Sequence, residues 1–370
     1  MSGIRLVTDV VVIGAGQAGL SAAHHLQRLG LEPVKQLIVL DDQPEAGGAW
    51  RHRWPSLTLS TVNRLHDLPG LPFADVVGSP GGEVQANRAV PEYFAAYERH
   101  FKLPVWRPVK VARVGRTGGG FLIRTDSGKI RTRGIINATG TWQTPNVPIY
   151  PGSDAFLGRQ LHTVDYRMAD EFAGQKVVIV GGGISALQLL DEVSRVADTT
   201  WVTRREPDFR EGPFDETAGR RAVAIVEDRV RRGLPPESVV SITGLPVTEH
   251  VRAMRERGVL QRKPMFSELL PDGIRWPDGS SQVADVIIWN TGFRSSLDHL
   301  APLGLKNEAG GITMDGRLAT RVAAEPAIHL VGYGPSASTI GANRAGGVAA
   351  RELLAELELL PAQRPVELSL

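Results

Sequence analysis

The stretch that decides the fold is Val10-Val11-Val12-Ile13-Gly14-Ala15-Gly16-Gln17-Ala18-Gly19. Four β-branched residues run directly into a G-x-G-x-x-G turn, and apolar residues at helical spacing follow it. This pattern predicts a strand, a tight turn and a helix. Gly14 permits the turn, Gly16 lets a pyrophosphate approach the backbone, and Gly19 lets the helix pack close to the strand. We expect Gln17, at the start of the helix, to contact the same ligand.

A carboxylate follows the next predicted strand, Ile38-Val39-Leu40. Asp41 stands about 20 residues beyond Gly19, where a dinucleotide-binding unit carries the acid that binds a ribose hydroxyl. The turn and the acid together favour dinucleotide binding over a structural turn without a ligand. The double glycine ending at Gly48 lets the backbone run against a flat ring with Trp50 as its wall, and a loop with an anchoring aromatic is the alternative.

The same pattern occurs a second time, from Val177 onwards. Four apolar residues lead into Gly181-Gly182-Gly183-Ile184-Ser185-Ala186, with Ala186 in place of the third glycine. Two such units in one chain indicate two dinucleotides that are handled together. The candidate contacts of the second unit are Gly181, Gly183, Ser185 and Ala186.

Two arginines, Arg204 and Arg205, end the strand that follows the second turn. A carboxylate at this place would repel a 2′-phosphate, whereas guanidinium groups bind one. We therefore expect NADPH rather than NADH at the second site, with some use of NADH left open. A solvated pair of charges is the alternative interpretation.

Small residues at other strand ends are expected to complete the cofactor sites. Ala138-Thr139-Gly140 ends one predicted strand, and Thr291-Gly292-Phe293 repeats the arrangement after a buried run. A Gly- and Ala-rich helix from about residue 340 offers a further N-terminus to the ring. The candidate contacts from these segments and from the run Val109–Val114 are Val111, Thr139, Gly140, Gly292, Phe293 and Ile340.

Further predictions concern secondary structure alone. The alternation in Leu57–Val62 is typical of a half-buried strand. Pro91 is expected to open a short helix after a long surface loop over residues 69–90. Amphipathic helices are predicted over Ala218–Arg232 and Glu249–Arg257.

The composition narrows the class of protein. The 370 residues are 42% hydrophobic and 22% charged, which is typical of a soluble globular protein long enough for two domains. A net charge of +2, without a basic stripe among aromatics, argues against nucleic-acid binding. No membrane span, signal peptide or metal site is predicted. The chain has no cysteine, which excludes disulfides and fits the cytoplasm.

A further motif points to a family. Phe156-x-Gly158-x-x-x-His162-x-x-x-Tyr166 lies just before the second turn. It resembles the F-x-G-x-x-x-H-x-x-x-(F/Y) fingerprint of the flavin-containing monooxygenases, which are class B flavoprotein monooxygenases. Baeyer–Villiger relatives carry Trp at the last position, so Tyr166 favours the former. The resemblance covers nearly the whole chain and is to the compact, soluble bacterial members.

This resemblance implies an α/β fold of two Rossmann-like dinucleotide-binding domains, with the NADPH domain inserted in the FAD domain. The expected bounds are 1–150 for the first part of the FAD domain, 151–287 for the NADPH domain and 288–370 for the remainder. Many members carry an active-site Asn between flavin and nicotinamide, and Asn63 is the nearest candidate here. His162 is the other catalytic candidate, although a structural role within the fingerprint is the more ordinary one.

The implied reaction leaves the redox chemistry to the flavin. NADPH reduces FAD, reduced FAD binds O2 as a C4a-(hydro)peroxyflavin, and one oxygen passes to a soft nucleophile, either a sulfide or an amine, with a ketone as a further option. Two alternatives stay open: a cysteine-free NADPH-dependent flavoprotein reductase that passes electrons to a carrier, and a non-enzymatic nucleotide-sensing subunit. The expected partners are O2 and a small-molecule substrate, with a homodimer left open.

Overall fold

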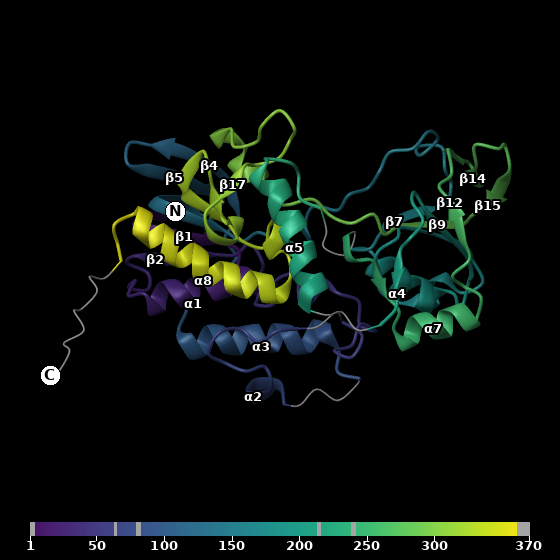
Figure 1. The fold of residues 1–370 in the computed structure, drawn as a ribbon, viewed down its shortest axis with the longest axis horizontal. Helices are drawn as coiled ribbons and strands as arrows, with labels where there is room; N and C mark the ends of the chain where they lie inside the picture. The colour runs from purple at the N-terminus through teal and green to yellow at the C-terminus, as the bar shows by residue number, and fades with distance from the viewer. Residues whose placement is uncertain (1–3, 63–64, 79–82, 213–215, 238–241, 361–370) are drawn as a thin grey trace.

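The structure is a computed structural model that describes residues 4–62, 65–78, 83–212, 216–237 and 242–360. It contains two α/β units, which we call the first unit and the second unit, each built on its own sheet (Figure 1). The described part of the chain begins and ends in the first unit, and the second unit lies to its right in Figure 1.

The sheet of the first unit combines strands from the beginning of the chain with strands from its last third. In spatial order its main path is β17 (Met314–Asp315), β18 (Arg321–Val322), β19 (Glu325–Leu330), β6 (Gly128–Asn137), β1 (Ile4–Ile13), β2 (Leu37–Leu40) and β3 (Val105–Trp106). The hairpin of β4 (Val111–Thr117) and β5 (Gly120–Thr125) joins through β5 to β6. β1 pairs in parallel with both β2 and β6, and its end is buried on both faces, which explains the unbroken apolar run Val10–Ile13.

The sheet of the second unit is entirely parallel. Its order is β12 (Arg262–Pro264), β9 (Asp198–Thr203), β8 (Lys176–Val180), β16 (Val286–Trp289) and β7 (Arg159–His162). β8 is the strand predicted before the second glycine turn, and β9 is the strand that ends at the two arginines. Smaller sheets pair β10 (Phe209–Arg210) with β11 (Leu245–Pro246), and β13 (Glu268–Leu270) with β14 (Gly273–Arg275) and β15 (Ser281–Val283).

Helices cover both sheets. Those of the first unit are α1 (Gln17–Arg28), α2 (Ala74–Val77), α3 (Ala86–Phe101) and α8 (Thr339–Glu356), and those of the inserted segment are α4 (Ile184–Val193), α5 (Glu216–Arg231) and α7 (Glu249–Glu256). α1 and α8 lie side by side (Figure 1). A Cβ at Gly346 of α8 would lie 2.8 Å from the backbone nitrogen of Ala22, so the small residues of α8 permit this close packing.

The connectivity confirms the predicted fold class. The strands of the second sheet fall between β6 and β17 in the chain, so the second unit is inserted in the first. α5, although it comes from the inserted segment, packs against β17 and the 3-10 turn Gly334–Ser336 of the first unit. β16 also runs across residue 287. The domain bounds at 150 and 287 therefore stay a prediction.

Two secondary-structure predictions are wrong and two are confirmed. Leu57–Val62 forms turns rather than a strand, because the Thr61 hydroxyl bonds to the backbone of Thr58. Pro91 lies inside α3, which begins five residues earlier at Ala86, so the surface loop predicted over residues 69–90 is shorter and is also interrupted by α2. α5 and α7 confirm the two amphipathic helices.

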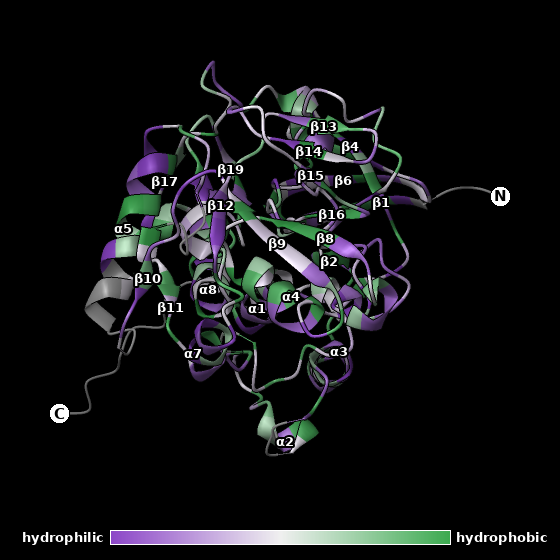
Figure 2. Ribbon diagram, turned by 90° about the vertical axis from the view of Figure 1, so that its right-hand side faces the viewer, coloured by the Kyte–Doolittle hydropathy of each residue, from purple (hydrophilic) through white to green (hydrophobic). Residues whose placement is uncertain are grey.

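One hydrophobic core joins the two units. Trp54, Leu57 and Ala86 of the first unit pack in the same buried cluster as the strands and helices of the second unit. Figure 2 shows hydrophobic strand segments, such as those of β8, lying over helices whose outer faces are hydrophilic. In the described part of the chain, no helix has the length and apolar character that crossing a membrane requires.

Candidate functional site

The first glycine turn connects the buried β1 to α1. Gly14 has a φ of 99°, and a Cβ there would lie 2.5 Å from the carbonyl oxygen of Ala138. A Cβ at Gly19 would lie 1.8 Å from the carbonyl oxygen of Gly14. At Gly16, in contrast, a Cβ would meet nothing within 4 Å. Packing therefore requires the outer two glycines, whereas Gly16 leaves open space in front of the helix N-terminus.

A cavity of about 680 Å³ opens at this turn, where the carboxyl ends of β1, β2 and β6 meet. Among the residues that line it are nine predicted cofactor contacts: Gly14, Gly16, Gln17, Asp41, Gly48, Trp50, Val111, Thr139 and Gly140. An open backbone cradle, a carboxylate one strand away and an aromatic wall suit a pyrophosphate, a ribose and a flat ring respectively. The residues present therefore fit FAD.

Asp41, the predicted ribose acceptor, is 6% exposed and lies at the cavity wall. Its Oδ2 accepts hydrogen bonds from Nε and Nη2 of Arg107, at 3.3 and 3.0 Å. Arg107 also pairs with Glu98, with 2.6 Å between Nη1 and Oε2. Burial raises the pKa of Asp41, and the hydrogen bond from Arg107 opposes this rise. Arg107 thus fixes the orientation of the carboxylate that faces the cavity.

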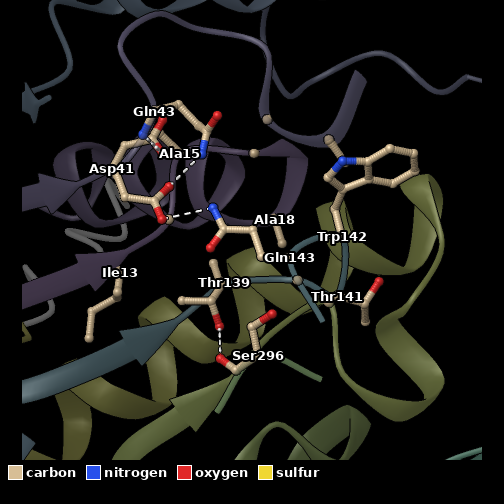
Figure 3. A pocket seen from close by; sticks show the side chains of 18 of the residues that line it. Ile13, Ala15, Ala18, Asp41, Gln43, Thr139, Thr141, Trp142, Gln143 and Ser296 are labelled. Carbon is tan, nitrogen blue, oxygen red and sulfur yellow. Dashed lines mark hydrogen bonds between the residues drawn. The ribbon is translucent and has the colours of Figure 1, made fainter. Parts of the chain in front are cut away.

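A chain of hydrogen bonds lies at the end of β6, and Figure 3 shows its link between Thr139 and Ser296. Asn137 Nδ2 donates to Thr139 Oγ1 at 3.0 Å, and Thr139 Oγ1 donates to the carbonyl of Ser296 at 2.6 Å. His299 Nε2 lies 2.7 Å from Asn137 Oδ1, and burial lowers the pKa of His299 to about 4. The imidazole is therefore neutral near pH 7 and donates to the amide oxygen. The network ties β6 to the chain that returns from the second unit.

The second glycine turn repeats this geometry at the end of β8. Gly181 has a φ of 144°, and a Cβ there would lie 2.3 Å from the carbonyl oxygen of Asn290. A Cβ at Gly183 would meet nothing within 4 Å, as at the middle glycine of the first turn. Ala186 is fully buried in the third position, and Ser185 lies in the first turn of α4. This turn therefore also offers an open cradle for a pyrophosphate.

Three arginines gather at the carboxyl end of β9. Arg204 and Arg205 are exposed directly after the strand. Arg262 of β12 donates from Nε to Thr203 Oγ1 at 2.8 Å and from Nη2 to the Thr203 carbonyl at 3.3 Å. Sequence reasoning missed Arg262, because only the parallel pairing of β12 with β9 brings it to this strand end.

A row of rings joins the two segments that cross between the units. Trp142, which lines the cavity, stacks on Phe293 with ring centroids 5.2 Å apart. His162 packs edge-on against Phe293 at 5.0 Å, and its Nε2 lies 3.0 Å from the carbonyl oxygen of Gly292. Burial lowers the pKa of His162, so the neutral ring donates to this carbonyl. The structure thus places His162 at the crossover and not among the residues lining the cavity, and its catalytic role stays a prediction.

Several predicted contacts do not line the cavity. Gly19 packs beneath the turn, and Gly292 and Phe293 approach the cavity through Trp142. Ile340 is 38% exposed, and its neighbour Thr339 lines the cavity instead. Asn63 lies outside the described residues.

Other lining residues were missed by sequence reasoning. Gln143 donates from Nε2 to Asp42 Oδ2 at 2.8 Å, and Ser296 lies on the other side of the cavity (Figure 3). His299 also lines the cavity. Gln143 lies three residues after Gly140, so the small residues at this strand end could have identified it. Ser296 lies in a loop and His299 in the short 3-10 helix Asp298–Leu303, and neither has a recognisable sequence pattern. Arg107 depends on the two-residue strand β3, which is too short to predict.

Comparisons with known proteins agree with this site. A family model described as pyridine nucleotide-disulphide oxidoreductase matches residues 11–249. The chain is 36% identical to the flavin-containing monooxygenase from Stenotrophomonas maltophilia, with a TM-score of 0.80 and coverage of 95% of this chain and 100% of that chain. It is 29% identical over 313 residues to the uncharacterized oxidoreductase CzcO of Bacillus subtilis strain 168, covering 82% of this chain and 86% of that protein. It is 28% identical over 346 residues to an indole-3-pyruvate monooxygenase of Oryza sativa subsp. japonica, covering 84% of this chain and 82% of that protein.

The family model spans both glycine turns, and the match to the Stenotrophomonas structure covers 95% of the chain. They confirm the resemblance that the fingerprint indicates and the two cofactors that it implies. The chain therefore belongs to the pyridine nucleotide-disulphide oxidoreductase family and, within it, is a flavin-dependent monooxygenase of the flavin-containing type that uses FAD and NADPH.

Proposed function

We propose that the chain uses NADPH, FAD and O2 to oxygenate a small soft nucleophile, either a sulfide or an amine. The observation that carries this proposal is the likeness to the Stenotrophomonas enzyme, which spans 95% of the chain and therefore includes both dinucleotide turns. A carbonyl compound is the second candidate substrate, since the rice relative is named for indole-3-pyruvate.

The proposal assigns a separate role to each turn. The first turn holds FAD, with Gly16 at the pyrophosphate and Asp41 at the ribose. The second turn holds NADPH, with Gly183 at the pyrophosphate and with Arg204 and Arg205 at the 2′-phosphate. Residues 1–150 and 288–370 then form the FAD domain, and residues 151–287 form the NADPH domain.

When bound, FAD supplies the redox and oxygen-activating chemistry. The residues of the chain bind and orient FAD and shield it from water. Trp50 and Trp142 wall the cavity and limit the access of water, and the stack of Trp142 on Phe293 keeps that wall attached to the crossover from the second unit. His299, neutral near pH 7, brings no charge to this wall.

Labelled oxygen tests the proposal. The FAD-loaded protein should turn over NADPH with a thioether or a tertiary amine in O2 enriched in heavy oxygen, with product analysed by mass spectrometry and H2O2 by peroxidase assay. We expect one labelled oxygen atom in each product molecule and equimolar NADPH consumption. Conversion of all consumed O2 to H2O2 with every substrate class would contradict the proposal.

The same experiment separates the two alternatives. A carrier reductase would reduce a dye or carrier rapidly without O2 and would yield no labelled product. A nucleotide-sensing subunit would bind FAD and NADPH without consuming NADPH. A disulfide reductase of this family requires thiols near the flavin, and the chain has no cysteine.

A further inference from the structure

The helix that begins at the second glycine turn is attached to the first unit near its other end. Three donors converge there on the carboxylate of Glu192. Trp54 Nε1 lies 3.2 Å from Oε1, Ser56 Oγ lies 2.7 Å from Oε2, and the Tyr166 hydroxyl lies 2.6 Å from Oε2. Trp54 and Ser56 belong to the first unit, so this carboxylate connects the two units.

The packing around the Glu192 carboxylate fixes the geometry of its hydrogen bonds. Trp54 and Tyr166 are each 1% exposed, and their rings pack edge to face with centroids 5.8 Å apart. Within the described residues, no Lys or Arg forms an ion pair with Glu192, so its partners are neutral donors. Hydrogen bonds to an ionised carboxylate are about twice as strong as neutral ones and are sensitive to geometry.

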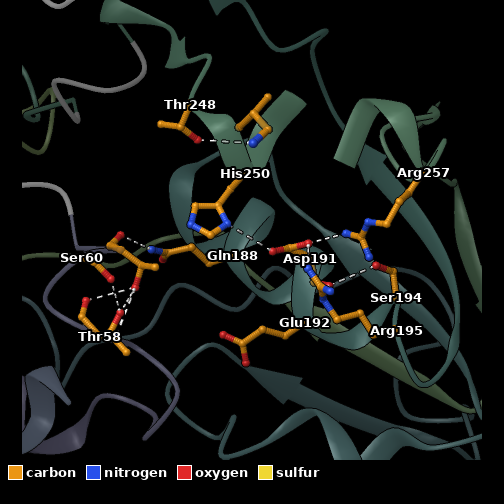
Figure 4. Close-up of polar contacts among 12 residues, drawn as sticks. Thr58, Ser60, Gln188, Asp191, Glu192, Ser194, Arg195, Thr248, His250 and Arg257 are labelled. Atoms are coloured by element: carbon orange, nitrogen blue, oxygen red, sulfur yellow. Dashed lines mark hydrogen bonds and ion pairs between the residues drawn. The ribbon is translucent and has the colours of Figure 1, made fainter. Parts of the chain in front are cut away.

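A second contact reinforces the first one turn earlier on α4. Gln188 Nε2 donates to the carbonyl of Thr61 at 3.0 Å. Because positions four apart share one face of a helix, Gln188 and Glu192 both form hydrogen bonds with the same segment of the first unit, residues 54–61. Figure 4 shows Gln188 reaching toward Thr58 and Ser60, and Asp191 turned instead to Arg195 and Arg257. Segment 54–61 follows Gly48 and Trp50, which line the flavin cavity.

We propose that Glu192 is a positioning residue that sets the position of the NADPH-binding turn relative to the flavin cavity. Its Cα stands about 12 Å along the helix axis from the start of α4 at Ile184, at 1.5 Å per residue. A tilt of α4 at Glu192 therefore displaces the turn that carries Gly183. Misplacement of reacting groups by about 1 Å costs about 100-fold in rate. Tyr166, the last residue of the fingerprint, then helps to orient the carboxylate of Glu192 through its hydroxyl group.

This inference rests on the proposed NADPH site at the second turn and is independent of the oxygen chemistry. It is tested on the FAD-loaded protein by anaerobic stopped-flow reduction with saturating NADPH. Glu192→Leu should lower the first-order rate of flavin reduction on the order of 100-fold, and Glu192→Gln, which keeps one acceptor, on the order of 10-fold. FAD content and the Kd of NADP+ from calorimetry should change by no more than about twofold.

Hydrogen exchange provides a readout that does not depend on turnover. In the oxidised, FAD-loaded protein, residues 54–61 should exchange faster in Glu192→Leu than in the wild type. Asp191→Asn is the matched control, because Asp191 pairs with Arg195, Arg257 and His250 inside the second unit only. It should change neither the reduction rate nor the exchange of residues 54–61.

Three results would overturn the inference. The first is an unchanged reduction rate in both Glu192 variants, and the second is an equal fall in Asp191→Asn. The third is a fall in rate matched by loss of FAD or of NADP+ affinity, which would indicate general damage. If NADPH does not reduce the wild-type flavin, the proposed function fails, whereas the exchange comparison still decides whether Glu192 holds the segment.

Discussion

The two glycine turns share one sequence pattern and differ in how the protein surrounds them. The first lies in a cavity of about 680 Å³, and its acid is buried against an arginine. The second is followed by two arginines that are exposed to solvent. The comparison indicates that one unit is built to retain its dinucleotide and the other to exchange it, as a flavoprotein reduced by NADPH requires.

The third position of each turn shows the difference at atomic scale. A Cβ at Gly19 would overlap the carbonyl oxygen of Gly14 at 1.8 Å, whereas Ala186 is accommodated and fully buried. The helix of the first unit therefore sits closer to its turn than α4 does. At the third position, therefore, the two turns differ by one methyl group.

Exchanging these residues should give the largest effect. Gly19→Ala forces the backbone of the first turn apart, so we expect purified protein without FAD. Ala186→Gly removes a buried methyl group and a good helix former, which costs about 1 kcal/mol and leaves NADP+ binding intact. FAD absorbance after gel filtration and calorimetry with NADP+ measure the two outcomes. Retained FAD in Gly19→Ala would show that the turn can relax.

Arg107 should carry the next largest effect. Arg107→Met leaves the carboxylates of Asp41 and Glu98 buried without their cation, which costs about 3–5 kcal/mol. Arg116→Met is the control, since the pair with Glu325 is half-exposed and is worth less than about 1 kcal/mol. Urea unfolding measures both variants. Equal losses of stability in Arg107→Met and Arg116→Met would show that the buried network of Arg107 stabilises the protein no more than an exposed ion pair does.

The arginines of the second site should affect affinity instead of stability. Arg204→Ala combined with Arg205→Ala removes charge-assisted hydrogen bonds to a 2′-phosphate that are together worth about 1.5–3 kcal/mol at this exposed position. The KM for NADPH should rise about 10- to 100-fold, and the KM for NADH about twofold or less. Steady-state kinetics with both coenzymes compares them. Parallel changes in the two KM values would show that neither arginine reads the phosphate.

Acid should also lower the stability of the first unit, through its buried histidines. Burial lowers the pKa of His24 to about 4 and that of His329 to about 3. The unfolded chain takes up protons near pH 6.5 and the folded chain does not, so stability falls as the pH drops below 6.5, by roughly 2 kcal/mol for each residue at pH 5. Urea unfolding at pH 7 and pH 5 measures the loss, and His329→Asn should reduce its pH dependence. If His329→Asn showed the same pH dependence as the wild type, His329 would not be one of the residues that cause the loss of stability in acid.

Local patterns predicted what depends on local geometry. The glycine turns, Asp41 and the small residues at Thr139 and Gly140 occupy strand ends, and a parallel sheet brings such ends together. Arg107 and Arg262 escaped prediction because their positions depend on β3 and β12, of two and three residues. Glu192 escaped prediction because its donors come from two distant segments, around Trp54 and at Tyr166, which no periodicity connects to α4.

The strand predicted at Leu57–Val62 failed for a related reason. Its alternation is real, but the hydroxyl groups of Thr58, Ser60 and Thr61 bond within the segment and to its backbone. Such short-range bonds compete with strand pairing. The resulting turns place Thr61 where its carbonyl meets Gln188 of the second unit.

The middle glycines test the central claim most directly, because a side chain there points into open space in both turns. The measurement is FAD content and NADP+ affinity in Gly16→Val and Gly183→Val, side by side. Gly16→Val should be purified as a folded protein without FAD. Gly183→Val should contain stoichiometric FAD and should bind NADP+ at least about 100-fold more weakly than the wild type. Stoichiometric FAD in Gly16→Val, or lost FAD with normal NADP+ affinity in Gly183→Val, would contradict the account.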